Sequence, residues 1–283
     1  MNNLFSAYLA RLIKNRAFWV FLIFMIGFGA GAPVIAHHEM VKYGVSYSCE
    51  SRLAWHVMLT GLITALFTVW FLGTEYSDGT IRNKLVAGHI RRNIYLASLG
   101  SCILAHMIIL LVHMLVISVL GQWLIAPFSV KAGELALFYL LSLLIGITFT
   151  SVYTMLVMQN QNKSAAVVLC VLVCFTLYMA AFYIYAMLTA PEMIPTGDVV
   201  TVFTNDGSGP QNIEREMIPN PKYLRGVWRT VYEWLQDIIP FGQAISLAEW
   251  KLENSMRMIC CNLALTVCST LVGLYRFERK DLR

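Results

Sequence analysis

The chain has 283 residues, of which 58% are hydrophobic and 13% are charged, and its formal net charge is +5. A soluble domain carries about 25% charged and about 45–50% apolar residues, so this composition excludes an ordinary soluble domain and indicates a membrane protein. The basic residues lie mostly beside apolar segments, which gives no reason to expect a nucleic-acid partner.

Residues 1–16 precede the first apolar segment and are predicted to form an amphipathic helix. Apolar side chains recur at helical spacing from Leu4 to Ile13, and the basic residues Arg11, Lys14 and Arg16 project elsewhere. This pattern is typical of a helix that lies in the plane of the membrane interface.

Six apolar segments are long enough to cross a bilayer, because a hydrocarbon core of about 30 Å requires roughly 20 helical residues. They are apolar on all sides, whereas a surface helix of a soluble protein has a polar face. We therefore predict an all-α membrane protein with a single transmembrane domain over residues 1–283. The expected spans cover residues 17–36, 53–73, 94–121, 135–158, 165–188 and 258–275.

A cleaved signal peptide is the alternative interpretation of the first span. Basic residues precede it, and Ala30-Gly31-Ala32 resembles a cleavage site. Against cleavage, Pro33 follows at once and the apolar run is longer than the core of a signal peptide.

The orientation follows from Lys and Arg residues, which accumulate in the short cytoplasmic loops of membrane proteins. With a cytoplasmic N-terminus, the short outer loops hold only Lys42, Arg52 and Lys131. The inner segments then hold Arg11, Lys14, Arg16, Arg82, Lys84, Arg91, Arg92, Lys163, Arg276, Arg279, Lys280 and Arg283. This distribution predicts that both termini are cytoplasmic.

A polar segment, residues 75–92, separates the second and third spans on the predicted cytoplasmic side. Ser77 or Asp78 is expected to cap a short helix over residues 79–86, because a side-chain oxygen can accept a free backbone N–H there. Glu75 lies at the membrane boundary, where it could pair with Arg82 or accept backbone N–H groups.

The faces of this short helix leave two interpretations open. Ile81 and Leu85 fall on one face as an apolar ridge, and Arg82 and Lys84 flank it. Such a helix suits insertion into a groove of a partner protein. The alternative is an interfacial loop whose basic residues only anchor the chain at the membrane.

The region 189–254 is the only large segment on the predicted outer side. Its first half is rich in Pro, Gly, Asn and Asp and is predicted to form turns. In its second half, apolar residues from Tyr223 to Ile238 repeat at helical spacing among charges that disfavour exposure to lipid. Pro240 and Gly242 are expected to break this helix, and a second short helix follows from Gln243. We predict a helical hairpin that lies in, or dips into, the outer leaflet as a re-entrant element.

Two stripes within the spans are candidates for a substrate path. The second span carries His56, Thr60, Thr64 and Thr68 at intervals of four residues. The fifth span carries Phe175, Tyr178, Phe182 and Tyr185 on one face. The alternative for both is structural, because such hydroxyl groups commonly bond to their own helix and aromatic stripes commonly pack against neighbouring helices.

The remaining reactive side chains give no catalytic or metal site. The seven cysteines show no metal-ligand spacing, although a bridge from Cys49 to Cys260 or Cys261 is geometrically possible. His106 and His113 are seven residues apart on one helix, about 10 Å, which is too far for one metal ion without further ligands. No charged residue lies deep within a span, which disfavours an ion-coupled carrier or an intramembrane enzyme.

Taken in order, these segments resemble the permease subunits of ABC-2 type transporters. The resemblance rests on six spans, on the N-terminal interfacial helix and on "GTEYSDGTIRNKLVAGHIRRNIYLASL" after the second span. "NPKYLRGVWRTVYEWLQDIIPFGQAISL" before the last span and the ending "YRFERKDL" are also similar to the family pattern. The resemblance covers nearly the whole chain, and its individual motifs are loose although their order is specific.

The resemblance implies a bacterial plasma-membrane subunit that works with a second permease subunit and with a separate cytosolic ATPase. ATP and Mg would bind to that partner, because this chain contains no Gly-x-x-x-x-Gly-Lys-Ser/Thr loop and is expected to hold no cofactor. The coupling helix would be formed by residues Asp78, Gly79, Thr80, Ile81, Arg82, Lys84 and Leu85, with Glu75 stiffening the joint.

The implied function is the outward movement of an amphipathic peptide, antibiotic or lipid-like molecule. An alternative from another class is a membrane immunity or sensor protein that binds an antimicrobial peptide at its outer hairpin.

Overall fold

The computed structural model describes residues 2–195 and 217–280. The parts of the expected outer loop and of the C-terminal ending that fall at 196–216 and 281–283 lie outside this description. Within the described residues, six helices are long and apolar enough to cross a membrane, which confirms an all-α membrane protein. These helices are α2 (Arg16–Tyr43), α4 (Trp55–Ser77, preceded by the short α3, Cys49–Leu53), α6 (Arg91–Leu124), α7 (Ala132–Gln159), α8 (Lys163–Leu188) and α11 (Ser255–Arg279).

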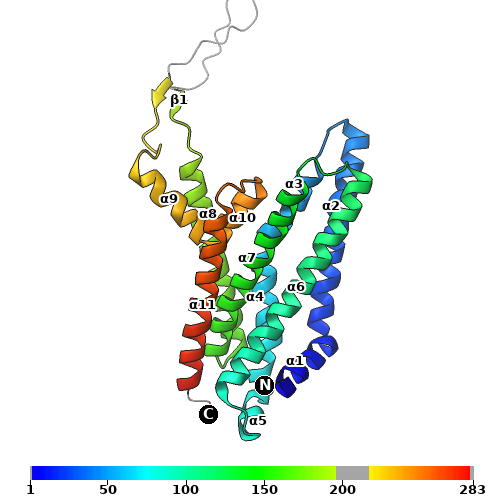
Figure 1. Ribbon diagram of the computed structural model, residues 1–283, viewed down its shortest axis with the longest axis vertical. Helices are drawn as coiled ribbons and strands as arrows, with labels where there is room; N and C mark the ends of the chain where they lie inside the picture. The colour runs from blue at the N-terminus through cyan, green and yellow to red at the C-terminus, as the bar shows by residue number, and fades with distance from the viewer. Residues whose placement is uncertain (1, 196–216, 281–283) are drawn as a thin grey trace, which may run out of the picture.

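The spanning helices are longer than expected at almost every end. The largest difference is in α2, which continues through Pro33 to Tyr43, so residues 37–43 are helical and do not belong to the outer loop. Gly44 ends α2 with a left-handed φ of 67°, a conformation that glycine adopts without strain. The helix packs along α6 (Figure 1), and His37 Nδ1 lies 2.7 Å from the Leu124 carbonyl oxygen near the shared end.

The bundle has a buried centre and two flanks. Helices α4 and α7 pack against each other in the middle, α2 and α6 lie on one side, and α8 and α11 lie on the other (Figure 1). Large aromatic side chains fill the centre, among them Phe67 and Phe71 of α4 and Phe149 and Tyr153 of α7. The helix α1 (Asn2–Lys14) crosses the lower end of the bundle in Figure 1, where the end of α11 also lies.

The opposite, upper end carries two further helices, α9 (Val227–Ile238) and α10 (Pro240–Ala248). The predicted helix–break–helix is present, but the expected break is wrong by a few residues. The break lies at the extended residue Ile239, and Pro240 begins α10, because a proline without an N–H is tolerated in the first turn of a helix. Every residue of α10 from Pro240 to Leu247 is buried, and Phe241 packs on Phe149 with ring centroids 4.8 Å apart.

The predicted turn region also contains a small sheet that the sequence interpretation missed. Strands β1 (Met193–Pro195) and β2 (Met217–Pro219) pair antiparallel, with Ile194 opposite Ile218. Both strands have the sequence Met-Ile-Pro, so the internal repeat of Glu-Met-Ile-Pro was the signal that could have identified them.

The close approach of α10 to the end of α9 leaves no room for a side chain at Gly242. A Cβ atom there would lie 2.2 Å from the backbone oxygen of Gln236. We expect Gly242→Ala to lower the free energy of unfolding by about 1–3 kcal/mol, the range for overpacking a close contact. Thermal unfolding of the purified chain measures this change. Gly133→Ala is the matched control, because a Cβ at Gly133 meets nothing within 4 Å; equal melting of the two variants would contradict the prediction.

Candidate functional site

The polar segment after α4 forms a tight turn and a short helix at the lower end of the bundle. The turn passes through Gly79, whose φ of 66° is left-handed, and the helix is α5 (Thr80–Val86). Neither Ser77 nor Asp78 caps α5, so the predicted cap is wrong. Ser77 instead donates to the Thr74 carbonyl at 3.0 Å, and Thr80 Oγ1 donates to the Glu75 carbonyl at 3.1 Å.

Glu75 is fully buried and joins three helices. Its Oε1 atom accepts a hydrogen bond from Lys84 of α5 at 2.8 Å and forms an ion pair with Arg11 of α1. Its Oε2 atom accepts a hydrogen bond from the Tyr8 hydroxyl of α1 at 2.9 Å. The expected pairing of Glu75 with Arg82 is wrong, because the carboxylate pairs with Arg11 and Lys84 and Arg82 is exposed.

The network continues from Glu75 to the third spanning helix. The Tyr8 hydroxyl also lies 2.6 Å from Ser98 Oγ of α6. Arg11 donates to the Phe71 carbonyl at 2.9 Å and to Thr74 Oγ1 at 2.8 Å, both on α4. We call this set of contacts between α1, α4, α5 and α6 the Glu75 junction.

Burial sets the protonation of the groups around this junction. Desolvation lowers the pKa of Lys84, and the nearby Glu75 carboxylate opposes that shift. Desolvation and the Glu75 charge both raise the pKa of Tyr8, so Tyr8 is a neutral donor at physiological pH. Lys84 also lies over the Tyr8 ring, 3.8 Å from its centroid. A buried carboxylate is stable only when paired and hydrogen-bonded, and Glu75 meets both conditions.

The two faces of α5 differ from the prediction. Ile81 is only 2% exposed and Leu85 packs against the core, so this ridge holds α5 to its own chain and cannot enter a groove of a partner. The outward face instead carries Arg82, Asn83 and Val86, and Val86 is 88% exposed. Ile81 and Leu85 face the rest of the chain because a helix of seven residues is too short to be stable without packing.

A hollow of about 280 Å³ lies beside α5. Its lining comes from the end of α4, from the turn, from α5 and from the link between α7 and α8. The lining residues are Glu75, Tyr76, Ser77, Gly79, Ile81, Arg82 and Gln161.

The end of α11 is tied to the same region by two basic residues, Arg91 and Lys280, which in the sequence indicated only the orientation of the chain. Arg91, at the start of α6, donates to the Glu278 carbonyl at 3.2 Å and to the Lys280 carbonyl. Lys280 donates to the Met158 carbonyl at 3.0 Å and lies 3.4 Å from the Tyr76 hydroxyl. Desolvation lowers the pKa of Lys280 to about 8. Residues from α4, α6, α7 and α11 thus meet at this end of the bundle.

The stripe on α4 lies inside the chain. Thr60, Thr64 and Thr68 are at most 2% exposed. Thr60 donates to the His56 carbonyl at 3.0 Å and Thr64 to the Thr60 carbonyl at 2.6 Å, and Thr64 also lies 3.1 Å from the His106 ring of α6. The expectation that this stripe faces a second subunit is not met within the chain, because its threonines are buried where α4 packs mainly on α7 and α8 and Thr64 contacts α6.

Of the four aromatic residues in the stripe on α8, two are packed or bonded within the chain and two are exposed. Tyr178 packs edge-on against Phe241 of α10, with ring centroids 5.3 Å apart, and Tyr185 donates to Glu249. Phe175 and Phe182 are 54% and 41% exposed, so only these two remain available to a partner or a substrate.

The cysteines and histidines take structural positions. All seven cysteines lie in the described part of the chain and all are free, so the possible bridge from Cys49 is absent; its sulfur packs against Gly121. His106 and His113 contact different partners, since His113 Nδ1 lies 2.8 Å from the Met25 carbonyl.

These features define a helical membrane protein with a short basic helix fixed to the end of its bundle. Residues 3–282 match the family described as ABC-2 family transporter protein, so the chain belongs to that family. Its members are membrane components of transporters. A search of curated proteins found no match.

Proposed function

We propose that this chain is the permease subunit of an ATP-driven exporter whose ATPase is a separate cytosolic protein. The observation that carries the proposal is the two-sided construction of α5. Its inner side is held through Ile81 and the Glu75 junction, and its outer side offers Arg82, Asn83 and Val86. A docked ATPase would contact the outer side and bind ATP and Mg itself.

The junction would make α5 a lever. A displacement of α5 would be transmitted to α4 through Glu75, to α1 through Arg11 and Tyr8, and to α6 through Ser98. Ion pairs and hydrogen bonds in a place of low water content resist extension more than exposed contacts do. Movement of α5 would therefore tilt these helices together instead of bending the link. The coupling roles of Glu75, Asp78, Gly79, Thr80, Ile81, Arg82, Lys84 and Leu85 belong to this proposal.

The proposed orientation places the α5 end in the cytoplasm of a bacterial cell, with both termini there. The excess of Lys and Arg at that end supports it. A second permease subunit would then cover part of the exposed apolar surface, and Phe175 and Phe182 of α8 are candidates to face it or the cargo. The cargo is proposed to be amphipathic, because the exposed surface of α8 combines apolar side chains with the hydroxyl groups of Thr176 and Tyr183.

Photo-crosslinking tests the docking proposal. A photoreactive amino acid placed at Val86 of the chain, expressed with its candidate ATPase, is expected to yield a covalent product of the two subunits. The same amino acid at Val45, an exposed position at the opposite end of the bundle, is the control and should yield none. Equal yields from both positions, or no product from Val86 in an intact complex, would refute docking at α5.

The alternative of an immunity or sensor protein makes a different prediction. Such a protein would protect cells against a peptide even when Val86 carried a charge that prevents ATPase docking.

A further inference from the structure

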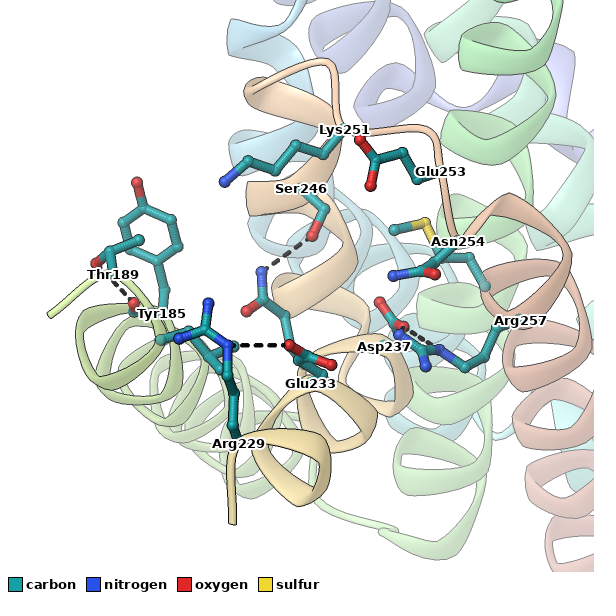
Figure 2. Close-up of a pocket in the computed structure, with 13 residues that line it drawn as sticks. Tyr185, Thr189, Arg229, Glu233, Asp237, Ser246, Lys251, Glu253, Asn254 and Arg257 are labelled. Atoms are coloured by element: carbon teal, nitrogen blue, oxygen red, sulfur yellow. Dashed lines mark hydrogen bonds and ion pairs between the residues drawn. The ribbon is translucent and has the colours of Figure 1, made fainter. Parts of the chain in front are cut away.

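A cavity of about 270 Å³ opens at the upper end of the bundle, far from the Glu75 junction. Its walls come from the end of α8, from α9, from α10 and from the start of α11, as Figure 2 shows. This volume is at the lower limit for small-molecule pockets, so it fits a compact polar group better than a peptide or a drug-sized molecule.

The charges around the cavity are balanced. Three cationic side chains, Arg229, Lys251 and Arg257, and three anionic ones, Glu233, Asp237 and Glu253, line it. A cavity for an anion or for a cation would carry an excess of the opposite charge. The balanced lining is complementary to a zwitterion.

The six charged side chains differ in how strongly they pair with one another. The buried Asp237 pairs with the half-buried Arg257 at the junction of α9 and α11, and Arg257 also lies over the Trp234 ring, 4.8 Å from its centroid. By contrast, Arg229 and Glu233 are both more than 40% exposed and 3.4 Å apart. Such an exposed pair contributes little stability, so a ligand can replace it at low cost.

Glu253 has no ion-pair or hydrogen-bond partner for its carboxylate among the described residues. It lies at the rim in the loop between α10 and α11, next to Lys251, as Figure 2 shows. Lys251 pairs with Glu249 at 2.5 Å. The cavity therefore has one free carboxylate and one weakly held Arg–Glu pair, which can receive an ammonium group and an oxyanion.

The position of the cavity indicates where the zwitterion comes from. Leu188 at the end of α8 and Met258 at the start of α11 line it, so it lies where two candidate spans end. The helix α9 turns its polar side to the cavity and exposes Trp228 and Trp234 on other sides. Tryptophans are enriched at the level of lipid headgroups.

The geometry points to a binding site for the zwitterionic headgroup of a phospholipid, with a phosphate facing Arg229 and a primary ammonium facing Glu253. This site does not depend on the proposed coupling to an ATPase. Phosphatidylethanolamine has this headgroup chemistry, whereas phosphatidylglycerol lacks the ammonium and phosphatidylcholine lacks an N–H that could donate to the carboxylates.

Native mass spectrometry of the full chain in detergent, titrated with each of these three lipids, tests the proposal. We expect one phosphatidylethanolamine to bind at least tenfold more tightly than phosphatidylglycerol, with phosphatidylcholine between them. Equal binding of phosphatidylethanolamine and phosphatidylglycerol would overturn the proposal. Soluble glycerophosphoethanolamine distinguishes a lipid from a free zwitterion: weak competition supports a lipid, and saturation at the same concentration as the lipid overturns it.

The double variant Arg229→Gln/Glu253→Gln is expected to lower phosphatidylethanolamine binding at least tenfold. The control is Arg225→Gln/Glu192→Gln, which removes an exposed ion pair of 2.7 Å outside the cavity and should leave binding unchanged. If the double variant melts earlier than the control, Glu253→Gln alone replaces it, because that side chain has no partner to lose; unchanged binding in either pocket variant would refute the site.

Discussion

Replacing Glu75 by Gln is expected to reduce transport and ATPase coupling at least tenfold and to destabilise the chain. The neutral side chain loses its ion pairs with Arg11 and Lys84 but keeps its volume. Removing one partner of a buried pair costs about 3–5 kcal/mol. Because the Arg11 and Lys84 side chains are 30% and 21% exposed and retain water, we expect about 2–3 kcal/mol here.

Thermal unfolding of the purified chain and stimulation of the ATPase measure the two effects of Glu75→Gln. Glu278→Gln is the matched control, because Glu278 is exposed at the same end of the bundle and none of the described residues forms an ion pair with it. A Glu75→Gln variant that melts and transports like Glu278→Gln would show that the junction carries neither stability nor coupling.

Replacing Val86 by Glu is expected to abolish docking of the ATPase while leaving the chain itself intact. Val86 is 88% exposed, and substitutions at such positions usually change the free energy of unfolding by less than about 0.5 kcal/mol. In a complex, the new carboxylate would be buried in a contact without a partner. A central contact residue contributes at least about 2 kcal/mol, or roughly 30-fold in affinity.

Co-purification of the ATPase with the chain measures the effect of Val86→Glu, and Val45→Glu at the opposite end is the control. The combination of an unchanged melting temperature and lost co-purification would separate docking from folding. Full co-purification of the Val86→Glu variant would place the docking surface elsewhere than on α5.

The sequence predicted the spans well and their partners poorly. Apolar length identifies a helix that must be removed from water, and this property needs no knowledge of the neighbours. The partner that each helix face contacts, in contrast, can be predicted only when the neighbouring helices are known. The threonine stripe of α4 has the same periodicity whether it meets α6, a second subunit or a substrate, and only the position of α4 at the centre of the bundle decides between them.

The long-range polar contacts could not be predicted from the sequence either. Arg11 and Glu75 are 64 positions apart, and each had closer candidate partners along the chain. The same holds for the buried network in which Asn262 of α11 donates to Gln243 of α10 at 2.6 Å and accepts from Thr148 of α7 at 2.8 Å. Hydrophobic periodicity assigns such polar residues to a face but does not say which chain segment satisfies them.

By itself, the amino-acid sequence determined that this protein is a helical membrane protein with a short basic helix after the second span, because length, polarity and breaking residues act locally. Only the tertiary structure decided that Ile81 points inward, that Glu75 joins α1 to α5, and that six balanced charges meet around a cavity at the opposite end of the bundle. The physical reason is that burial and charge pairing depend on which elements pack together, and in this bundle those elements are far apart in the chain.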